Sequence, residues 1–107
     1  MTKGTLTARL TGVTSKTELL AELSRQLGFP DYFGANWDAL YDCLTDLGWL
    51  DADITQVVLR HEDIPKLPPH ELATYRELLR DAAQQWQRSD ESRRIRVHFP
   101  DEERRAP

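Results

Sequence analysis

Three short apolar segments, separated by helical segments, constrain the fold of this chain more than any other feature. Residues 5–10 and 95–99 alternate between apolar and polar side chains, and residues 56–60 form a β-branched apolar run. Strands that are joined through helices run parallel, and such crossovers are almost always right-handed. The order strand–helix–helix–strand–helix–strand therefore predicts an α/β fold, with a small three-stranded parallel sheet flanked by helices.

The three predicted helices have recognisable boundaries. The first follows Ser15, which forms a capping-box pattern with Glu18, and it ends at Gly28, a residue type suited to a left-handed cap. The second begins after Asn36 and extends to about residue 47. The third covers about residues 71–87. Residues 61–69 contain three prolines, so we expect a loop or one broken turn there.

A single cytoplasmic domain over residues 1–107 is the expectation. The chain has no internal repeat or break in composition, and its 107 residues can bury a modest core. Residues 100–107 are too polar to pack and are expected to form a frayed tail. Cys43 is the single cysteine and is expected to be a buried small hydrophobe. No signal-peptide core or membrane-length apolar run is present, so we expect no membrane contact.

Acidic residues are concentrated in one stretch of the chain. The formal net charge is −4, and no Lys or Arg occurs from residue 26 to residue 58. Six aspartates fall inside this stretch: Asp31, Asp38, Asp42, Asp46, Asp51 and Asp53. A nucleic-acid binder would present a basic footprint instead, so we expect a basic protein partner and no nucleic acid. The basic run at Arg93, Arg94 and Arg96 follows two acids and is interpreted as the solvated start of a strand.

Three of these aspartates share the polar side of the predicted second helix at i, i+4 spacing: Asp38, Asp42 and Asp46. Their mutual repulsion costs on the order of a few tenths of a kcal/mol per pair. Asp38 is favoured by the helix dipole in the first turn, whereas Asp42 gains nothing from its position. The spacing alone leaves two interpretations open, a binding surface or a solvated helix face.

Four aromatic residues accompany the aspartates: Tyr32, Phe33, Trp37 and Tyr41. Phe33 is the best candidate for the core, but a loop and a short helix with an apolar face of its own cannot bury all four. Tyr and Trp beside an acidic face are typical of protein interfaces. The aromatic residues therefore favour a binding surface. We expect Gly34 to give the loop backbone freedom where it enters the helix.

Catalytic and metal sites are not predicted. The aspartates have no His, Ser or Lys nearby in sequence that could form a proton relay, and they lack the spacing of an EF-hand. His61, His70 and His98 show no ligand spacing and are interpreted as ordinary surface or strand residues. We therefore expect no catalytic residue, metal or cofactor.

The stretch PDYFGANWDALYDCL, residues 30–44, closely resembles the barstar family, intracellular inhibitors of small secreted microbial ribonucleases. The match covers a proline and an acid, two aromatic residues, a glycine, Asn36, and the run from Asp38 to Leu44. The order of predicted elements also fits the three-stranded parallel sheet of that family. The resemblance implies a stoichiometric inhibitor, monomeric when free, that binds a small ribonuclease with a basic active site in a 1:1 complex.

The resemblance also implies roles for individual residues. In the family, this helix and the loop before it plug the ribonuclease active site, and carboxylates stand where substrate phosphates would lie. Asp42 would enter the phosphate site, Asp38 would pair with a basic residue at its edge, and Tyr32 would pack on the catalytic histidine of the enzyme. Asp46 belongs to the same acidic stripe. Further contacts are implied for Phe33, Gly34, Asn36, Trp37, Tyr41 and, at the periphery, Asp81.

Several positions depart from the family pattern. Trp37 stands where a smaller aliphatic residue is usual, Asp81 is one methylene shorter than a glutamate, and Arg60 replaces an acid. The prolines in residues 61–69 shorten a helix that the family carries. These differences point to a different preferred ribonuclease. The alternative is an immunity or interaction protein of this fold with a basic partner that is not a ribonuclease, and an enzyme using Asp38 and Asp42 is more remote.

Overall fold

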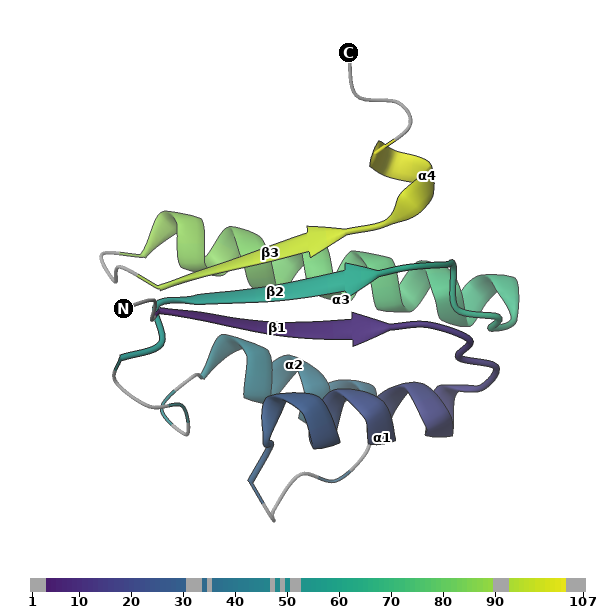
Figure 1. Cartoon of the computed structure of the whole chain (residues 1–107), viewed down its shortest axis with the longest axis horizontal. Coiled ribbons are helices and arrows are strands. Elements are labelled where there is room, and N and C mark those ends of the chain that lie inside the picture. Colours follow the sequence, from purple (N-terminus) through teal and green to yellow (C-terminus); the bar gives the residue numbers. More distant parts are fainter. Residues whose placement is uncertain are drawn as a thin grey trace.

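The computed structural model describes residues 4–30, 34, 36–46, 48, 50, 53–89 and 93–103. In chain order its elements are β1 (Thr5–Leu10), α1 (Lys16–Leu27), α2 (Trp37–Thr45), β2 (Gln56–His61), α3 (Pro69–Arg88), β3 (Arg94–His98) and α4 (Pro100–Glu103) (Figure 1). The three strands are parallel and lie in the order β1-β2-β3. The predicted α/β fold with a three-stranded parallel sheet is confirmed.

The helices cover one face of the sheet. Because each strand is the neighbour of the preceding one, two right-handed connections that advance in the same direction place their helices on the same side. The burial of the strands follows this arrangement, since Ala8, Leu59 and Ile95 are buried whereas Arg60 and Arg96 on the other face are exposed. Parallel sheets are usually covered on both faces, whereas the helices that the structure describes over residues 16–88 cover one face of this sheet.

The ends of α1 follow the predicted cap chemistry. The Ser15 Oγ accepts a hydrogen bond from the Glu18 N–H at 3.1 Å, and the Glu18 carboxylate accepts from the Thr14 N–H at 2.7 Å. At the other end Gly28 has a φ of 73° and donates its N–H to the Ser24 carbonyl at 2.9 Å. This left-handed cap ends the helix as the sequence indicates.

Other boundaries differ by a few residues from the prediction. α3 begins at Pro69, because proline is well suited to the first turn of a helix. Residues 62–68 form no helix, in agreement with the predicted loop. α2 ends at Thr45, earlier than expected, and the Thr45 hydroxyl donates to the Tyr41 carbonyl at 2.8 Å. Residues 100–103, the first half of the expected tail, form one helical turn.

The core lies between the sheet and the three long helices. Its largest fully buried side chains include Leu19, Leu20 and Leu23 of α1, Leu40 and Leu44 of α2, and Tyr75 and Leu79 of α3. Cys43 is buried as predicted, and burial raises the pKa of its thiol, with the charges of Asp42 and Asp46 acting in the same direction. In the part of the chain that the structure describes, no helix is long and apolar enough to cross a membrane.

Candidate protein interface

α2 is fixed at both ends by side-chain hydrogen bonds. At its start the Asn36 Oδ1 accepts from the Ala39 N–H at 2.7 Å, which confirms the predicted N-cap. At its end the Trp86 Nε1 of α3 donates to the Leu44 carbonyl at 2.8 Å, one of the carbonyls that a helix end leaves without a helical partner. Both ends of the helix therefore have defined positions, and the C-terminal one is tied to α3.

α2 has one apolar and one acidic side. Leu40, Cys43 and Leu44 are buried, whereas the three aspartates predicted to form a stripe are exposed: Asp38, Asp42 and Asp46. Within the described ranges no salt bridge reaches these aspartates. Asp46 has a local role as well, since its Oδ1 accepts from the Gly48 N–H at 3.2 Å.

An acidic groove of about 570 Å³ runs between α2 and α3. Its lining residues are Trp37, Asp38, Tyr41, Asp42, Thr74, Glu77, Leu78 and Asp81. Two carboxylates come from each helix, and none of the described lining residues is a Lys or Arg. The structure thus brings Asp81 together with Asp38 and Asp42, as the resemblance implied. The sequence analysis missed Glu77, although its position four residues before Asp81 on one helix face was a usable signal.

The two aromatic residues of the groove rest on the core. Trp37 is half-buried and stacks on Tyr75 of α3, with ring centroids 5.9 Å apart and an interplanar angle of 30°. The Lys16 Nζ lies 4.8 Å from the centroid of the Trp37 ring. Tyr41 is half-buried and packs against the core. Their rings form a rigid wall beside the carboxylates, because the core contacts limit their rotation.

Beneath Trp37 lies a buried polar contact that the sequence analysis missed. The His61 Nδ1 lies 2.8 Å from the His98 carbonyl, which can only accept, so Nδ1 carries the proton. The Tyr75 hydroxyl then donates to the His61 Nε2 at 2.7 Å. The His61 ring stacks on Phe99 with centroids 4.0 Å apart. His61 therefore fixes the tyrosine on which Trp37 rests.

This histidine is uncharged at neutral pH. It is 3% exposed, and burial lowers its pKa from 6.5 to about 4; the charge of Arg76 also lowers it, while the hydrogen bond to the His98 carbonyl opposes the change. The strand alternation of Val57, Leu59 and His61 was a signal for its burial, because these residues share one face.

Comparison with known proteins supports the same family as the sequence pattern. A family model described as "Barstar (barnase inhibitor)" matches residues 4–99. The chain belongs to the barstar family. A Bacillus subtilis (strain 168) protein named "Putative ribonuclease inhibitor YrdF" is 51% identical over 41 residues, which cover 38% of this chain and 43% of the relative. The chain thus aligns with less than half of that protein's length. Membership of the barstar family favours an inhibitor over an enzyme.

Two further family positions that the structure describes, Gly34 and Asn36, do not line the acidic groove. Asn36 serves as the cap of α2, and Gly34 is exposed before it. The expected backbone freedom of Gly34 is not used, because its φ is not positive and a Cβ there would meet its nearest atom, the Asn36 Nδ2, at 3.4 Å. Tyr32 and Phe33 lie outside the described residues. Among the residues described, no three His, Cys, Asp or Glu side chains gather as a metal site requires.

Proposed function

We propose that this protein is a stoichiometric inhibitor of a small secreted ribonuclease and that the acidic groove and its rim plug the cationic active site of that enzyme. The observation that carries the proposal is the convergence of four carboxylates from α2 and α3 on one groove whose described lining includes no Lys or Arg. A ribonuclease must hold phosphates with positive charge. A carboxylate-lined surface on a rigid support is complementary to such a site.

The proposed roles follow the position of each residue. Asp42 lies mid-helix, exposed and free of any described salt bridge, and would occupy the phosphate site. Asp38 and Asp81, on opposite walls of the groove, would meet basic residues around it. Trp37 and Tyr41 would provide the aromatic contact area that interface centres favour. Tyr32, Phe33, Gly34, Asn36 and Asp46 would complete the contact.

The charge distribution also suits the kinetics of inhibition. An acidic surface facing a cationic active site raises the rate of encounter, because opposite potentials steer diffusion. Occlusion needs no chemistry from the inhibitor, so a 1:1 complex of a cytoplasmic, monomeric inhibitor with its enzyme is sufficient. A cell that makes a secreted ribonuclease would be protected in this way before export.

An RNA-cleavage titration tests the proposal. Each member of a panel of small secreted microbial ribonucleases is titrated with wild-type protein, with Asp42→Ala and with Asp53→Ala, which removes the same charge outside the groove. We expect cleavage to fall to zero at one equivalent of wild type or Asp53→Ala, and to persist with Asp42→Ala. Inhibition that all three proteins share would refute the role of the groove, and inhibition of no member would favour a basic partner that is not a ribonuclease.

A further inference from the structure

β3 forms one edge of the sheet, and its outward backbone groups face no described strand. The Arg94 N–H donates to the Thr55 carbonyl at 2.9 Å, toward β2. The backbone groups of successive strand residues point in opposite directions, so those of Ile95 and Val97 point away from β2. Two N–H donors and two C=O acceptors are therefore presented along the outer edge of β3.

A second groove of about 580 Å³ follows this edge. On one side the groove is lined by every residue of the segment 94–99, so it runs along the strand rather than over one face of the sheet. On the other side the groove is lined by residues of α3 at helical spacing: Arg76, Leu79, Arg80, Ala83, Gln84 and Gln87. An extended chain rises about 3.3 Å per residue, so the five residues of β3 offer pairing over roughly 16 Å.

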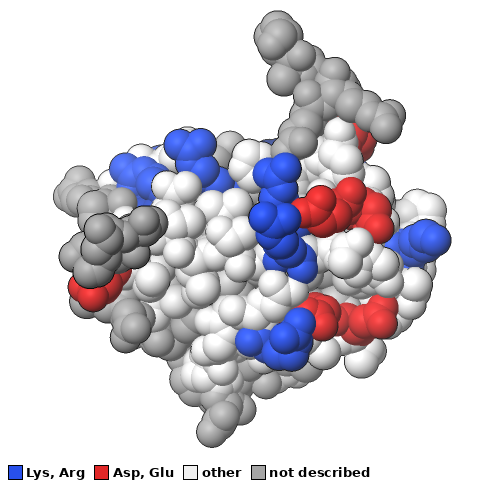
Figure 2. Space-filling view, in the orientation of Figure 1, with Lys and Arg blue, Asp and Glu red and all other residues white. Residues whose placement is uncertain are grey.

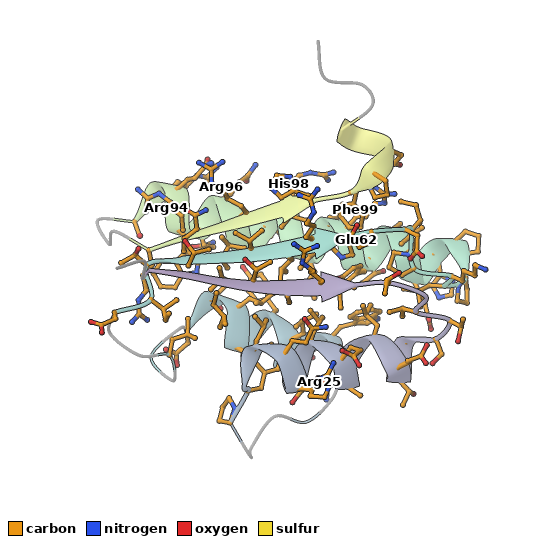
Figure 3. All side chains as sticks on the ribbon, viewed as in Figure 1. Arg25, Glu62, Arg94, Arg96, His98 and Phe99 are labelled. Atoms are coloured by element: carbon orange, nitrogen blue, oxygen red, sulfur yellow. The ribbon has the colours of Figure 1, made fainter. Side chains whose placement is uncertain are left out.

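The lining of this groove is basic. Among the described residues that line it are four arginines, Arg76, Arg80, Arg94 and Arg96, and no carboxylate. The Arg76 guanidinium forms a salt bridge with Asp101, with the Nη2 and Oδ2 atoms 2.9 Å apart, and it lies over the Phe99 ring. Arg80 and Arg96, in contrast, are exposed. Arg94, Arg96 and His98 follow one another along β3 in Figure 3, and Figure 2 shows Lys and Arg side chains gathered over that part of the molecule.

We propose that this basic groove binds an extended acidic segment of a partner protein, which adds to β3 as a fourth strand. Backbone hydrogen bonds to Ile95 and Val97 would give such a strand its affinity, and alternate side chains would give it specificity. Side chains beside Arg94 and Arg96 must be acidic, because charges on neighbouring strands interact most strongly on the same face. Side chains on the other face lie beside Val97 and Ala83, which are both half-buried, so the segment alternates acidic and apolar residues.

Two other occupants fit the groove less well. A second copy of β3, paired with the first, would bring arginines against arginines, which is how many natural edge strands avoid self-association. Single-stranded RNA would match the charge, but Phe99 is 2% exposed, and the described lining residues include no Tyr or Trp that would offer bases a large stacking surface. Neither occupant uses the outward backbone groups and the positive charge together.

The proposal does not rest on the ribonuclease-inhibitor function. Glu77 and Asp81 of the acidic groove each follow an arginine of the basic groove by one residue, and successive residues differ by about 100° around a helix. The two grooves therefore lie on different sides of α3. A partner in one groove leaves the other available.

Fluorescence anisotropy with defined peptides tests the proposal. The probes are a fluorescein-labelled seven-residue peptide of alternating Glu and Val, its Lys and Val counterpart, and a labelled polyuridylate. Two further Glu and Val peptides carry N-methyl groups, one on the Val amides and one on the Glu amides. Of the three probes, we expect only the acidic peptide to bind. Of its two N-methylated versions, one should lose affinity and the other should keep it. That alternation is the signature of strand pairing.

Protein variants locate the binding. Arg80→Gln/Arg96→Gln is expected to weaken peptide binding at least tenfold, whereas Arg25→Gln/Lys66→Gln, which removes the same charge outside the groove, should stay within twofold of wild type. Arg25 lies on α1, away from β3 (Figure 3). In ¹⁵N spectra, the Ile95 and Val97 amides should show the largest shifts. Four outcomes would each overturn the proposal. These are an equal loss of affinity in both variants, equal binding of the two N-methylated peptides, preferential binding of polyuridylate, and no binding of the acidic peptide.

Discussion

The two grooves beside α3 have nearly the same volume and opposite charge. In the part of the chain that the structure describes, the acidic groove, about 570 Å³, is lined by four carboxylates and no Lys or Arg, and the basic groove, about 580 Å³, by four arginines and no carboxylate. Helix α3 contributes residues to both grooves. Arg76 and Arg80 line the basic groove, and Glu77 and Asp81 line the acidic groove. Adjacent residues of opposite charge are separated by helix geometry into two surfaces. A net charge of −4 therefore conceals a basic surface.

Removal of the central carboxylate should have the largest effect on binding at the acidic groove. Asp42→Ala is expected to weaken binding to the inhibited ribonuclease by about 2–5 kcal/mol, a general range for interfacial charge pairs to which barstar complexes themselves contribute. Most of the loss should appear in the dissociation rate, which surface plasmon resonance measures. Arg80→Gln/Arg96→Gln serves as the comparison and should leave this dissociation rate unchanged. A similar loss in that variant would mean that both grooves contact one partner.

The buried histidine predicts a loss of stability in acid. In the unfolded chain His61 takes up a proton near pH 6.5, but in the fold it does so only near pH 4. The stability that the fold gains from keeping His61 uncharged is therefore fully present above pH 6.5. As the pH falls from 6.5 to 4, the free energy of unfolding should decrease by about 3 kcal/mol in total. Urea unfolding between pH 7.5 and 3.5 measures this loss.

His61→Leu is the control for the acid effect. It should be less stable at pH 7 by about 1–3 kcal/mol, because the buried Tyr75 hydroxyl loses its acceptor. Its stability should nevertheless depend less on pH between 6.5 and 4 than that of wild type. If the two proteins show the same pH dependence, other groups account for the acid sensitivity. Because His98 lines the basic groove and Tyr75 supports Trp37 of the acidic groove, this prediction concerns the structure between the two grooves.

The outer carboxylates of the acidic groove should contribute less than Asp42. Glu77→Gln and Asp81→Asn are each expected to weaken ribonuclease binding by about 0.2–1 kcal/mol, since exposed charges act mainly through steering. The association rate should fall, and the difference from wild type should shrink as salt is raised from 0.05 to 0.5 M. A loss that persists at high salt would place these residues at the centre of the contact.

The smallest expected effect concerns folding without a partner. Asp42→Asn removes repulsion from neighbours four residues away on both sides, so the free protein should gain on the order of a few tenths of a kcal/mol. Chemical denaturation at low and high salt measures the gain, which should diminish with salt. A clear destabilisation would show that Asp42 has a structural role in the fold.

Local chemistry was sufficient to predict much of the fold. Ser15, Gly28 and Asn36 act at helix ends through hydrogen bonds within a few residues, so their roles are readable from sequence. The end of α2 was less predictable, because the Thr45 hydroxyl can bond to a carbonyl of the preceding turn in place of continuing the helix. The alternation of strands and helices predicted the parallel sheet, whereas its strand order and the placement of the helices on one face come from the structure.

The surfaces were harder to predict, since they depend on contacts between distant segments. The acidic stripe of α2 was visible from the spacing of its aspartates, and the family resemblance indicated Asp81. Glu77 lines the acidic groove because α3 packs beside α2. Arg94 and Arg96 were interpreted as a solvated strand start, and only the packing of α3 along β3 places them opposite Arg80. The roles of Tyr32, Phe33 and the other interface residues stay predictions.

The sequential strand order has a consequence for synthesis on the ribosome. Each strand pairs with the one made just before it, so the sheet can grow in the order in which the chain emerges, as domains commonly do. β3 is the last strand to emerge. It ends at His98, whose carbonyl accepts the hydrogen bond from His61, and Phe99, which stacks on the His61 ring, follows directly. Until those residues leave the ribosome, His61 lacks two of its main contacts. The emergence of His98 and Phe99 is therefore the event that secures the tyrosine beneath the acidic groove.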